Sequence, residues 1–362
     1  MSGKLSQREN LLRMYRRQGY EYAPVAFVLC DSKQKEFFSR TGRQDYNNYY
    51  DFPYRVIPDV LYETYPRETY LKYYKTELKP GTYIDDYGTA HEPGSEAAYH
   101  MTYMRHPLEN ASSVEEILSY EFPKQSNPEA NIKKQADLVK ELRDAGYASY
   151  AEQQCTVWEK AWYVRSMPEL MTDMMMENDT ATVMLDIITE HACFSAKAYA
   201  QAGVDILFLG DDIGMQHTAM MSNELYRQWL KPRLIKVINT AKEYKPDILI
   251  QYHSCGFVEP FIDDLIEAGV DILNPVQPEC MDFSNLHNLH GDRLSFNGTL
   301  GTQSVLPFGT ADEVYAATTK NLKIAGEKGG LFCCPTHMVE PEVPFENIEA
   351  YVRACREFKV KG

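Results

Sequence analysis

Short apolar runs alternate with helical patterns through this 362-residue chain from about residue 112 onward. The runs are rich in β-branched residues, which is typical of buried strands. They lie at residues 148–154, 204–209, 248–252, 270–273, 294–296 and 331–334. Strands that alternate with helices pair in parallel. The sequence has neither GxGxxG after a strand nor GxxxxGKS/T, so it lacks the phosphate-binding loops of Rossmann and P-loop folds. The pattern therefore predicts an α/β protein built as a closed (β/α)8 TIM barrel.

The first 110 residues predict an N-terminal helical and hairpin extension together with the first barrel strand. Ser6 and Glu9 have the spacing of a capping box, which places a helix at residues 8–18. Three further elements are predicted here: an apolar strand at 24–30, a helix at 32–41 and a hairpin at 82–91. We predict one domain over residues 1–362, with residues 1–110 as the extension and first strand and residues 111–362 as the main barrel.

Composition and charge argue against several partners and locations. The net charge is −15 and no Lys/Arg-rich run occurs, whereas a nucleic-acid-binding protein needs a basic face. The start, MSGKLSQREN, has no apolar core of the signal-peptide kind, and no apolar stretch is long enough to span a bilayer. Eight cysteines in a chain of this length do not suggest a disulfide framework. We therefore expect a cytoplasmic protein with no membrane or nucleic-acid partner.

Polar residues follow the predicted strands at the points where the strands end. They are Asp211 and Asp212, then His253 and Cys255, then Asn274, Gln277 and Glu279, then Asn297 and Gln303, and finally Thr336 and His337. In a barrel the active site forms at the carboxyl ends of the strands. Polar residues follow five successive predicted strands. This favours one shared site over five strands that each simply end in solvent.

His253 and Cys255 form the sharpest motif. Side chains two residues apart in an extended strand point to the same side, so the imidazole and the thiol can bind one ion. Sulfur together with nitrogen favours zinc. A packed histidine beside a buried cysteine is the alternative interpretation. A catalytic zinc site needs three protein ligands, and Cys334 and His337, at the exit of the last strand, are the candidates for the third.

Three carboxylates are candidates for catalysis. One of Asp211 and Asp212 can serve as a metal or substrate carboxylate, while the other orients a neighbour or caps a helix. Glu159 lies between Trp158 and Trp162, and a carboxyl group among aromatic rings has a raised proton affinity and can act as an acid. A solvated glutamate at the start of a helix is an equally good interpretation.

The chain contains 26 tyrosines, which suits a pocket for a ring-bearing ligand, although tyrosine more often packs half-buried surfaces. Residues 45–55 form a Tyr-rich segment that is unusual as a mere connection. The residues predicted to bind substrate are Tyr49, Tyr50, Trp158, Trp162, Tyr252, Asn274, Gln277, Asn297 and Gln303.

On the basis of these residues, the chain resembles the uroporphyrinogen decarboxylase superfamily, in its branch of zinc-dependent, corrinoid-linked methyltransferases. The resemblance extends over nearly the whole chain and implies a barrel fold. The segments that carry it are WEKAWYVRSMPELMTDM (158–174), GDDIGMQ (210–216), LYRQWLKPRLIKVI (225–238), YHSCG (252–256), LIEAGVDILNPVQ (265–277) and GGLFCCPTHMVEPEVPFENIEAY (329–351).

The resemblance also implies a ligand set. In the coenzyme M methyltransferases of this branch, a His-x-Cys pair and a later cysteine hold zinc, so His253 and Cys255 match the pair. The later cysteine follows a proline by two residues, where this chain has His337 after Pro335, and Cys334 is the rival. True decarboxylases carry an N-terminal arginine-rich motif, and the matching segment APVAFVLCDS has no arginine. Porphyrinogen decarboxylation is therefore not expected.

The resemblance implies methyl transfer, with Zn2+ in this chain and cobalamin on a separate corrinoid protein. Our hypothesis is that a methoxylated, aromatic compound is the small-molecule methyl donor and that cob(I)alamin accepts the methyl group. We predict His337 as the third ligand, because fewer thiolates leave zinc a stronger Lewis acid for an ether oxygen. The runner-up is transfer from methylcobalamin to a thiol or tetrahydrofolate, and a non-catalytic ligand-binding barrel is the alternative of another class. The oligomeric state stays open, with a homodimer as one option.

Overall fold

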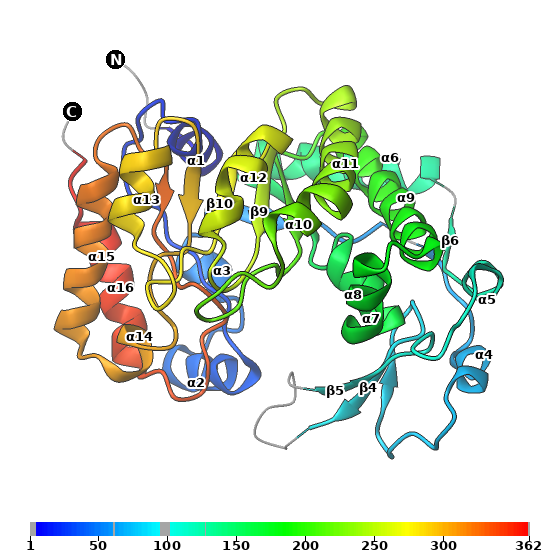
Figure 1. The fold of residues 1–362 in the computed structure, drawn as a ribbon. Helices are drawn as coiled ribbons and strands as arrows, with labels where there is room; N and C mark the ends of the chain where they lie inside the picture. Colours follow the sequence, from blue (N-terminus) through cyan, green and yellow to red (C-terminus); the bar gives the residue numbers. More distant parts are fainter. Residues whose placement is uncertain (1–4, 61, 95–101, 127, 361–362) are drawn as a thin grey trace.

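Seven parallel strands form a curled sheet surrounded by helices, which is a TIM-barrel-like α/β fold (Figure 1). The computed structural model describes residues 5–60, 62–94, 102–126 and 128–360. In sheet order the strands are β1 (Tyr54–Val56), β7 (Ala148–Gln153), β8 (Ile206–Gly210), β9 (Leu249–His253), β10 (Ile272–Asn274), β11 (Ser295–Asn297) and β12 (Leu331–Phe332). The rings of Tyr54 and Phe332, from the two outer strands, lie 6.5 Å apart, so the two edges of the curled sheet approach each other.

The strand predicted at residues 24–30 does not join the sheet, which corrects the sequence prediction. Within that segment only Leu29 forms a β-bridge, parallel to Val339. The Tyr351 hydroxyl accepts from the Ala26 N–H and donates to the Ala26 carbonyl, both at 3.3 Å. At Ala26 a side chain thus takes the place of ladder hydrogen bonds, whereas Val28 and Cys30 bond to the backbone of Val339. The sheet starts instead at β1, which begins at the end of the Tyr-rich segment of residues 45–55.

Helices pack around the sheet between successive strands. They are α6 (Pro128–Asp144), α7 (Trp158–Arg165), α8 (Met167–Met175), α9 (Asp179–Ala202), α10 (Asn223–Trp229), α11 (Lys231–Tyr244), η2 (Glu259–Phe261), α12 (Ile262–Ala268), α13 (Phe283–His290), α14 (Val305–Phe308), α15 (Ala311–Ala325) and α16 (Phe345–Glu357). Local sequence sets several ends: Thr310 and Glu313 form a capping box before α15, and Gly203 ends α9 with a φ of 86°. No helix within the described ranges is long and apolar enough to cross a membrane.

The N-terminal part forms the predicted helices and hairpin. The helices are α1 (Gln7–Tyr15), which begins with the Ser6–Glu9 capping box, and α2 (Asp31–Thr41). The hairpin pairs β3 (Tyr83–Ile84) with β4 (Ala90–Pro93), and β5 (Thr102–Arg105) adds a third strand. Shorter elements are α3 (Tyr46–Tyr49), β2 (Tyr62–Glu63), α4 (Arg67–Tyr70), η1 (Leu71–Tyr73), α5 (Val114–Leu118) and β6 (Lys124–Gln125). The hairpin sheet lies beside α7, where Thr89 Oγ1 donates to the Tyr163 carbonyl at 3.0 Å (Figure 1).

Aromatic rings fill part of the barrel interior. Tyr54 and Tyr150 stack with their centroids 4.8 Å apart, and Tyr150 lies 6.1 Å from Phe208. The ring of Phe208 in turn lies 5.4 Å from the imidazole of His253. These residues come from four neighbouring strands, β1, β7, β8 and β9. The last of these contacts places the His253 side chain on the interior face of the sheet.

α1 and the residues just after it lie against the amino ends of the strands. The Arg8 guanidinium donates to both carboxylate oxygens of Asp205, at 2.6 and 2.9 Å, directly before β8. Arg17 donates to the Ser295 hydroxyl at the start of β11, at 2.5 Å. The first helix therefore covers this end of the barrel, and the opposite end, where the strands finish, stays available for a site.

Candidate metal centre

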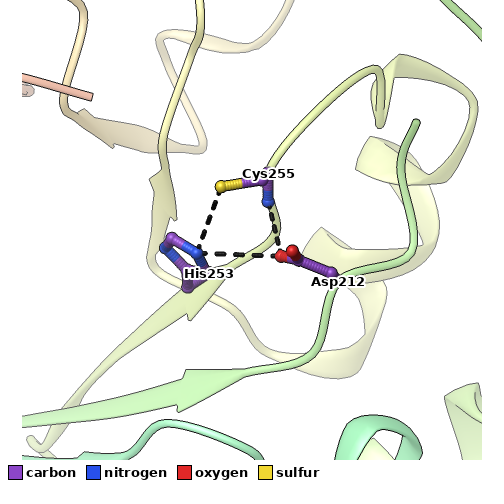
Figure 2. A group of neighbouring side chains, drawn as sticks. All are labelled: Asp212, His253 and Cys255. Atoms are coloured by element: carbon purple, nitrogen blue, oxygen red, sulfur yellow. Dashed lines mark hydrogen bonds and ion pairs between the residues drawn. The ribbon is translucent and has the colours of Figure 1, made fainter. Parts of the chain in front are cut away.

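Three side chains at the carboxyl ends of the neighbouring strands β8 and β9 converge on one point (Figure 2). Asp212 follows β8, His253 ends β9, and Cys255 lies two residues further on. His253 Nε2 lies 3.5 Å from Cys255 Sγ and 3.7 Å from Asp212 Oδ1. One ligand atom of each residue lies within 4.8 Å of the other two. Among the described residues, this is the one group of three such side chains that is close enough to hold a metal ion.

The loops after β8 and β9 touch backbone to backbone, and two glycines make this possible. A Cβ at Gly256 would lie 2.6 Å from the Met215 carbonyl oxygen, and one at Gly214 would lie 2.6 Å from the Cys255 carbonyl oxygen. Gly256 also has a φ of +83°, which side chains rarely adopt. In the same place Asp212 Oδ1 accepts from the Cys255 N–H at 2.7 Å. The contact between the loops thus brings the carboxylate beside the thiol.

A chain of hydrogen bonds fixes the orientation of His253. Its Nδ1 lies 2.5 Å from Asn274 Oδ1, and Asn274 Nδ2 donates to Asn297 Oδ1 at 2.7 Å. Asn297 Nδ2 donates in turn to the Tyr15 hydroxyl oxygen at 2.6 Å. Because Asn274 donates through Nδ2, its oxygen is left to accept from a protonated Nδ1 of the histidine. The Nε2 lone pair then faces Cys255, as a metal-bound histidine requires.

The donor set suits zinc. An imidazole nitrogen, a thiolate and a carboxylate are all common zinc ligands, and three protein ligands leave a fourth position open. Burial raises the pKa of the Cys255 thiol, and the carboxylates of Asp212 and Glu159 raise it further. A thiolate at neutral pH therefore needs a positive charge beside it, which a metal ion at this point would supply.

Neither residue predicted as the third ligand completes this group. His337 is exposed and Cys334 is buried, and neither forms such a group with the His–Cys pair. The Cys334 thiol instead donates to Asn297 Oδ1 at 3.3 Å, so it joins the hydrogen-bond chain behind the histidine. Asp212 lies closest to completing the group, because the loop after β8 folds against the loop after β9.

The other two predicted carboxylates lie behind Asp212. Asp211 is buried, and its carboxylate accepts from the N–H groups of Val157 and Glu159 at the start of α7, both at 2.9 Å. Asp211 therefore caps a helix that belongs to a different βα unit. Burial raises the pKa of Glu159 to about 9, and the charges of Asp212 and Asp211 add to the shift. A raised pKa is the direction that the predicted role of Glu159 as an acid requires, and that role stays a prediction.

The Tyr-rich segment builds core structure. Tyr50 is buried, with its ring 5.2 Å from Phe27, and its hydroxyl donates to Glu349 at 2.8 Å. Tyr49 packs edge-on against Tyr50 and Phe37. Neither tyrosine lines the cavity beside the candidate centre, so the structure does not support their predicted contact with substrate. The segment folds onto itself because its rings pack against one another, with Tyr50 buried and Tyr49 exposed.

The other aromatic residues predicted to bind substrate pack against neighbouring parts of the chain. Trp158 is fully buried at the start of α7. Tyr252 is buried in β9, and its hydroxyl donates to the Asp211 carbonyl at 3.2 Å. The ring of Trp162 contacts those of His106 and Tyr163. Each residue therefore has packing partners within the chain, and a contact with substrate stays a prediction.

A cavity of about 760 Å³ opens beside the candidate centre. Its wall includes Cys255, Gln277, Gln303, His337, Met215 and Phe308. Four of these, Cys255, the two glutamines and the histidine, are residues that the sequence places in the site. Small-molecule sites commonly combine apolar walls with a few polar groups. The cavity therefore offers room for a small molecule next to the Cys255 thiol.

Sequence reasoning missed Tyr15, the last member of the chain behind His253. No local pattern marks it, because its contact with Asn297 joins residues 282 positions apart. Asn274 and Asn297 were predicted at the site as substrate ligands. The structure places them between His253 and Tyr15, where they position the imidazole.

Fold and centre together define the class of this protein: an α/β barrel with a candidate metal site at the carboxyl ends of its strands. The chain belongs to the uroporphyrinogen decarboxylase (URO-D) family, whose model matches residues 104–358, well over half of the chain. Asp212, His253 and Cys255 all lie within the matched region.

Relatives include methyltransferases and decarboxylases. The chain is 29% identical over 193 residues to the methylcobamide:CoM methyltransferase MtaA of Methanosarcina barkeri, with 53% of each chain covered. It is 28% identical over 187 residues to a methylated-thiol–coenzyme M methyltransferase of Methanosarcina mazei, with 49% of this chain and 45% of the relative covered. A uroporphyrinogen decarboxylase of Coxiella burnetii is 22% identical over 193 residues, with 52% and 50% covered. The chain thus spans about half the length of the curated relatives it matches.

A solved structure shares the fold along the whole chain. A methyltransferase from Methanosarcina mazei superposes with a TM-score of 0.65 and covers 98% of this chain and 99% of its own. The two sequences are 18% identical, so this likeness concerns the fold alone.

Proposed function

We propose that this chain is a zinc-dependent methyltransferase. In this proposal it moves a methyl group from a methoxylated, aromatic compound to the cob(I)alamin of a separate corrinoid protein. The observation that carries the proposal is the group formed by Asp212, His253 and Cys255 at the carboxyl ends of β8 and β9. The names of two relatives, both coenzyme M methyltransferases, support the reaction class.

The ligand set supports an oxygen-bound methyl donor. It contains one sulfur, and each thiolate that donates charge to zinc weakens the ion as a Lewis acid. A zinc ion held by these three residues would polarise the ether oxygen of the donor at its open position. A second thiolate in the set would have favoured a bound thiol instead.

The residues of the chain bind the donor, orient the centre and supply a proton. The cavity beside Cys255 offers room for the methyl-ether end of the donor, and Asn274 keeps His253 Nε2 directed at the centre. The methyl group leaves without its bonding electrons for the reduced cobalt of the partner protein, so the donor oxygen keeps the electron pair and needs a proton. We assign that proton to Glu159, whose Oε2 accepts from the Asp212 N–H at 3.1 Å.

A second candidate function is transfer from methylcobalamin to a thiol or to tetrahydrofolate. The names of the coenzyme M relatives favour a thiol acceptor. In this reaction the acceptor sulfur would bind at the open position as a thiolate, and no proton donor would be needed for a leaving oxygen.

An assay of zinc-loaded protein with cob(I)alamin and a panel of methoxyarenes tests the proposal. We expect methylcobalamin to form with at least one methyl ether. His253→Ala and Cys255→Ala should form none and should lose bound zinc, while their circular-dichroism spectra stay native. His217→Ala, which changes an exposed histidine in the loop after β8, is the matched control and should keep the activity.

Other results of the same assay would change the assignment. If no methyl ether reacts but a thiol becomes methylated from methylcobalamin, the second candidate replaces the first. A folded protein that binds no stoichiometric zinc and turns over neither substrate would be a non-catalytic ligand-binding barrel.

A further inference from the structure

A second cavity, of about 400 Å³, lies between the barrel mouth, α9 and the N-terminal hairpin. Four carboxylates line it, whereas its wall contains a single lysine. The charged residues of the wall are Asp59, Asp85, Asp86, Glu152 and Lys160. Burial lowers the pKa of His191, which also lines the cavity, so this imidazole adds no charge at neutral pH. Carboxylates therefore outnumber cationic groups in the wall of this cavity.

Two of the carboxylates are partly removed from water and close to other negative charge. Burial raises the pKa of Glu152, and the charge of Asp59 contributes to the shift. Burial also raises the pKa of Asp59, while the Tyr199 hydrogen bond and the charge of Lys160 oppose the rise and the charge of Asp86 adds to it. Their hydrogen-bond donors, the Gln154 amide at 3.2 Å and the Tyr199 hydroxyl at 3.4 Å, are neutral. A cation between these carboxylates would relieve their repulsion.

Tyrosine rings complete the wall, and one of them already contacts a cation. The rings belong to Tyr62, Tyr83, Tyr87 and Tyr199. Lys160 Nζ lies 4.6 Å from the centroid of Tyr87, so this ring accepts an ammonium group over its face. Aromatic faces combined with carboxylates are the surroundings in which organic ammonium groups bind.

The spacing of the carboxylates argues against a bare metal ion as the occupant. Hard cations such as Mg2+ or Ca2+ need several oxygen ligands around one point. Among the described residues, no three carboxylates of this cavity bring their oxygens within 4.8 Å of one another. A larger cation, with its charge spread over several groups, fits these distances better.

The cavity adjoins the candidate metal centre through the sheet. Glu152 at the end of β7 pairs with Phe208 of β8, and the ring of Phe208 lies 5.4 Å from that of His253. Glu152 and His253 are thus separated by one strand, with the Phe208 ring beside the imidazole.

We propose that this cavity binds the ammonium group of an organic cation, and that the methyl donor is a methoxylated compound that carries such a group. The identity of the donor rests on the proposed function. The binding of the cation does not depend on it, because the cavity residues are not the residues of the metal centre.

Three ligands that share one methoxylated ring and differ in charge test the proposal. They are para-methoxybenzylamine, para-methoxybenzyl alcohol and para-methoxybenzoate. Calorimetric titration of the His253→Ala protein removes any contribution from a bound metal. We expect the protonated amine to bind about tenfold more tightly than the neutral alcohol, and the benzoate to bind more weakly than either.

Matched variants locate the effect in the cavity. Glu152→Gln and Asp59→Asn should each weaken binding of the amine about tenfold and leave the alcohol unchanged. Glu129→Gln removes an exposed carboxylate in the first turn of α6 and should change neither ligand. The three ligands are first compared on protein that carries neither cavity substitution. The test therefore stands even if one of the variants does not fold.

Equal affinity for the three ligands would overturn the proposal. Displacement of the amine by millimolar Mg2+ at constant ionic strength would also overturn it, because the cavity would then be an inorganic cation site. Failure of the proposed function has a different signature: the amine binds with the expected charge dependence, but zinc-loaded native protein forms no methylcobalamin from it. That result keeps the ammonium site and overturns the amine as methyl donor.

Discussion

The side-chain amide of Asn274 determines which nitrogen of His253 can bind a metal. It donates to Asn297, so its oxygen accepts from the histidine Nδ1 and leaves Nε2 free. Tyr15 holds the far end of this chain at 2.6 Å. The imidazole is therefore oriented before any ion binds, which lowers the entropic cost of assembling the site.

Replacement of this asparagine tests the argument. In Asn274→Ala the Nδ1–H loses its acceptor, and we expect the affinity for zinc to fall about 10- to 100-fold, as is usual for partners of metal-bound histidines. Competition with a chromogenic chelator measures the affinity. Asn110→Ala, an exposed asparagine, is the control. Unchanged affinity in a folded Asn274→Ala protein would show that the chain does not position the imidazole.

A second prediction about individual residues concerns the number of sulfur atoms that bind zinc. X-ray absorption at the zinc edge should find one sulfur neighbour per zinc, and Cys334→Ser and His337→Ala should leave that number unchanged. Asp212→Ala should lose zinc affinity, because it removes a ligand. Two sulfurs per zinc, reduced to one in Cys334→Ser, would contradict the ligand set and with it the support for an ether donor.

Sequence alone could identify two members of the centre and not the third. His253 and Cys255 follow from the two-residue period of a strand, which is local. The same reasoning left Asp211 and Asp212 as equivalent candidates and placed the third ligand in the last strand. The structure separates them because Gly214 and Gly256 allow two loops to touch, and loop contacts of this kind have no periodic signal.

Elements with strong patterns were predictable, and short elements set by tertiary contacts were not. The strands from β7 to β12 appear close to their predicted residues. β1 has three residues within an aromatic segment, too few for a pattern. Residues 24–30 are apolar enough for a strand, but Tyr351 takes up the backbone groups of Ala26. Contact partners far along the chain decided both cases.

α9 and the N-terminal elements meet at His191, which leads to a pH prediction. Its Nδ1 lies 2.9 Å from the Tyr87 hydroxyl, and its ring stacks on Tyr62. Burial lowers the pKa of His191 below its ordinary value of 6.5. The unfolded chain therefore takes up a proton where the native protein does not. Proton uptake by the unfolded chain lowers the free energy of unfolding. This free energy is at its full value above pH 6.5 and decreases as the pH falls toward the folded pKa of His191.

Denaturant unfolding at a pH of about 7.5 and of about 5.5 measures this effect. We expect the free energy of unfolding to be smaller at the lower pH than at the higher one. This decrease should be smaller in His191→Gln than in the native chain. His217→Gln, which changes an exposed histidine, should keep the native pH dependence. An identical slope in the native chain and in His191→Gln would show that this histidine does not resist protonation.

At the scale of the whole molecule, the contacts that stabilise the fold and the candidate centre lie at opposite ends of the barrel. α1 and the residues after it contact the amino ends of β8 and β11 through Arg8 and Arg17. The candidate centre and its cavity lie at the carboxyl ends of β8 and β9. This is the usual division in α/β barrels, where residues at the amino end hold the fold and residues at the other end act on substrates. Changes at the two ends should therefore have different consequences.

Arg8 provides the sharpest test of that division. Asp205 is 2% exposed and accepts from the Ser149 backbone N–H and hydroxyl as well as from the Arg8 guanidinium. Arg8→Ala leaves this buried carboxylate with neutral donors only. Since the arginine itself is partly exposed, we expect a loss of about 1–3 kcal/mol in the free energy of unfolding and a melting temperature lower by several degrees.

In Arg8→Ala the affinity for zinc and the methyl-transfer activity should equal those of the native chain, because the centre lies at the other end of the strands. Arg13→Ala removes an exposed arginine of the same helix and should change neither stability nor zinc binding. Thermal melts and chelator competition on the three proteins separate the two properties. A weaker zinc site in Arg8→Ala at an unchanged melting temperature would contradict the division, because α1 would then act on the centre through the length of the barrel.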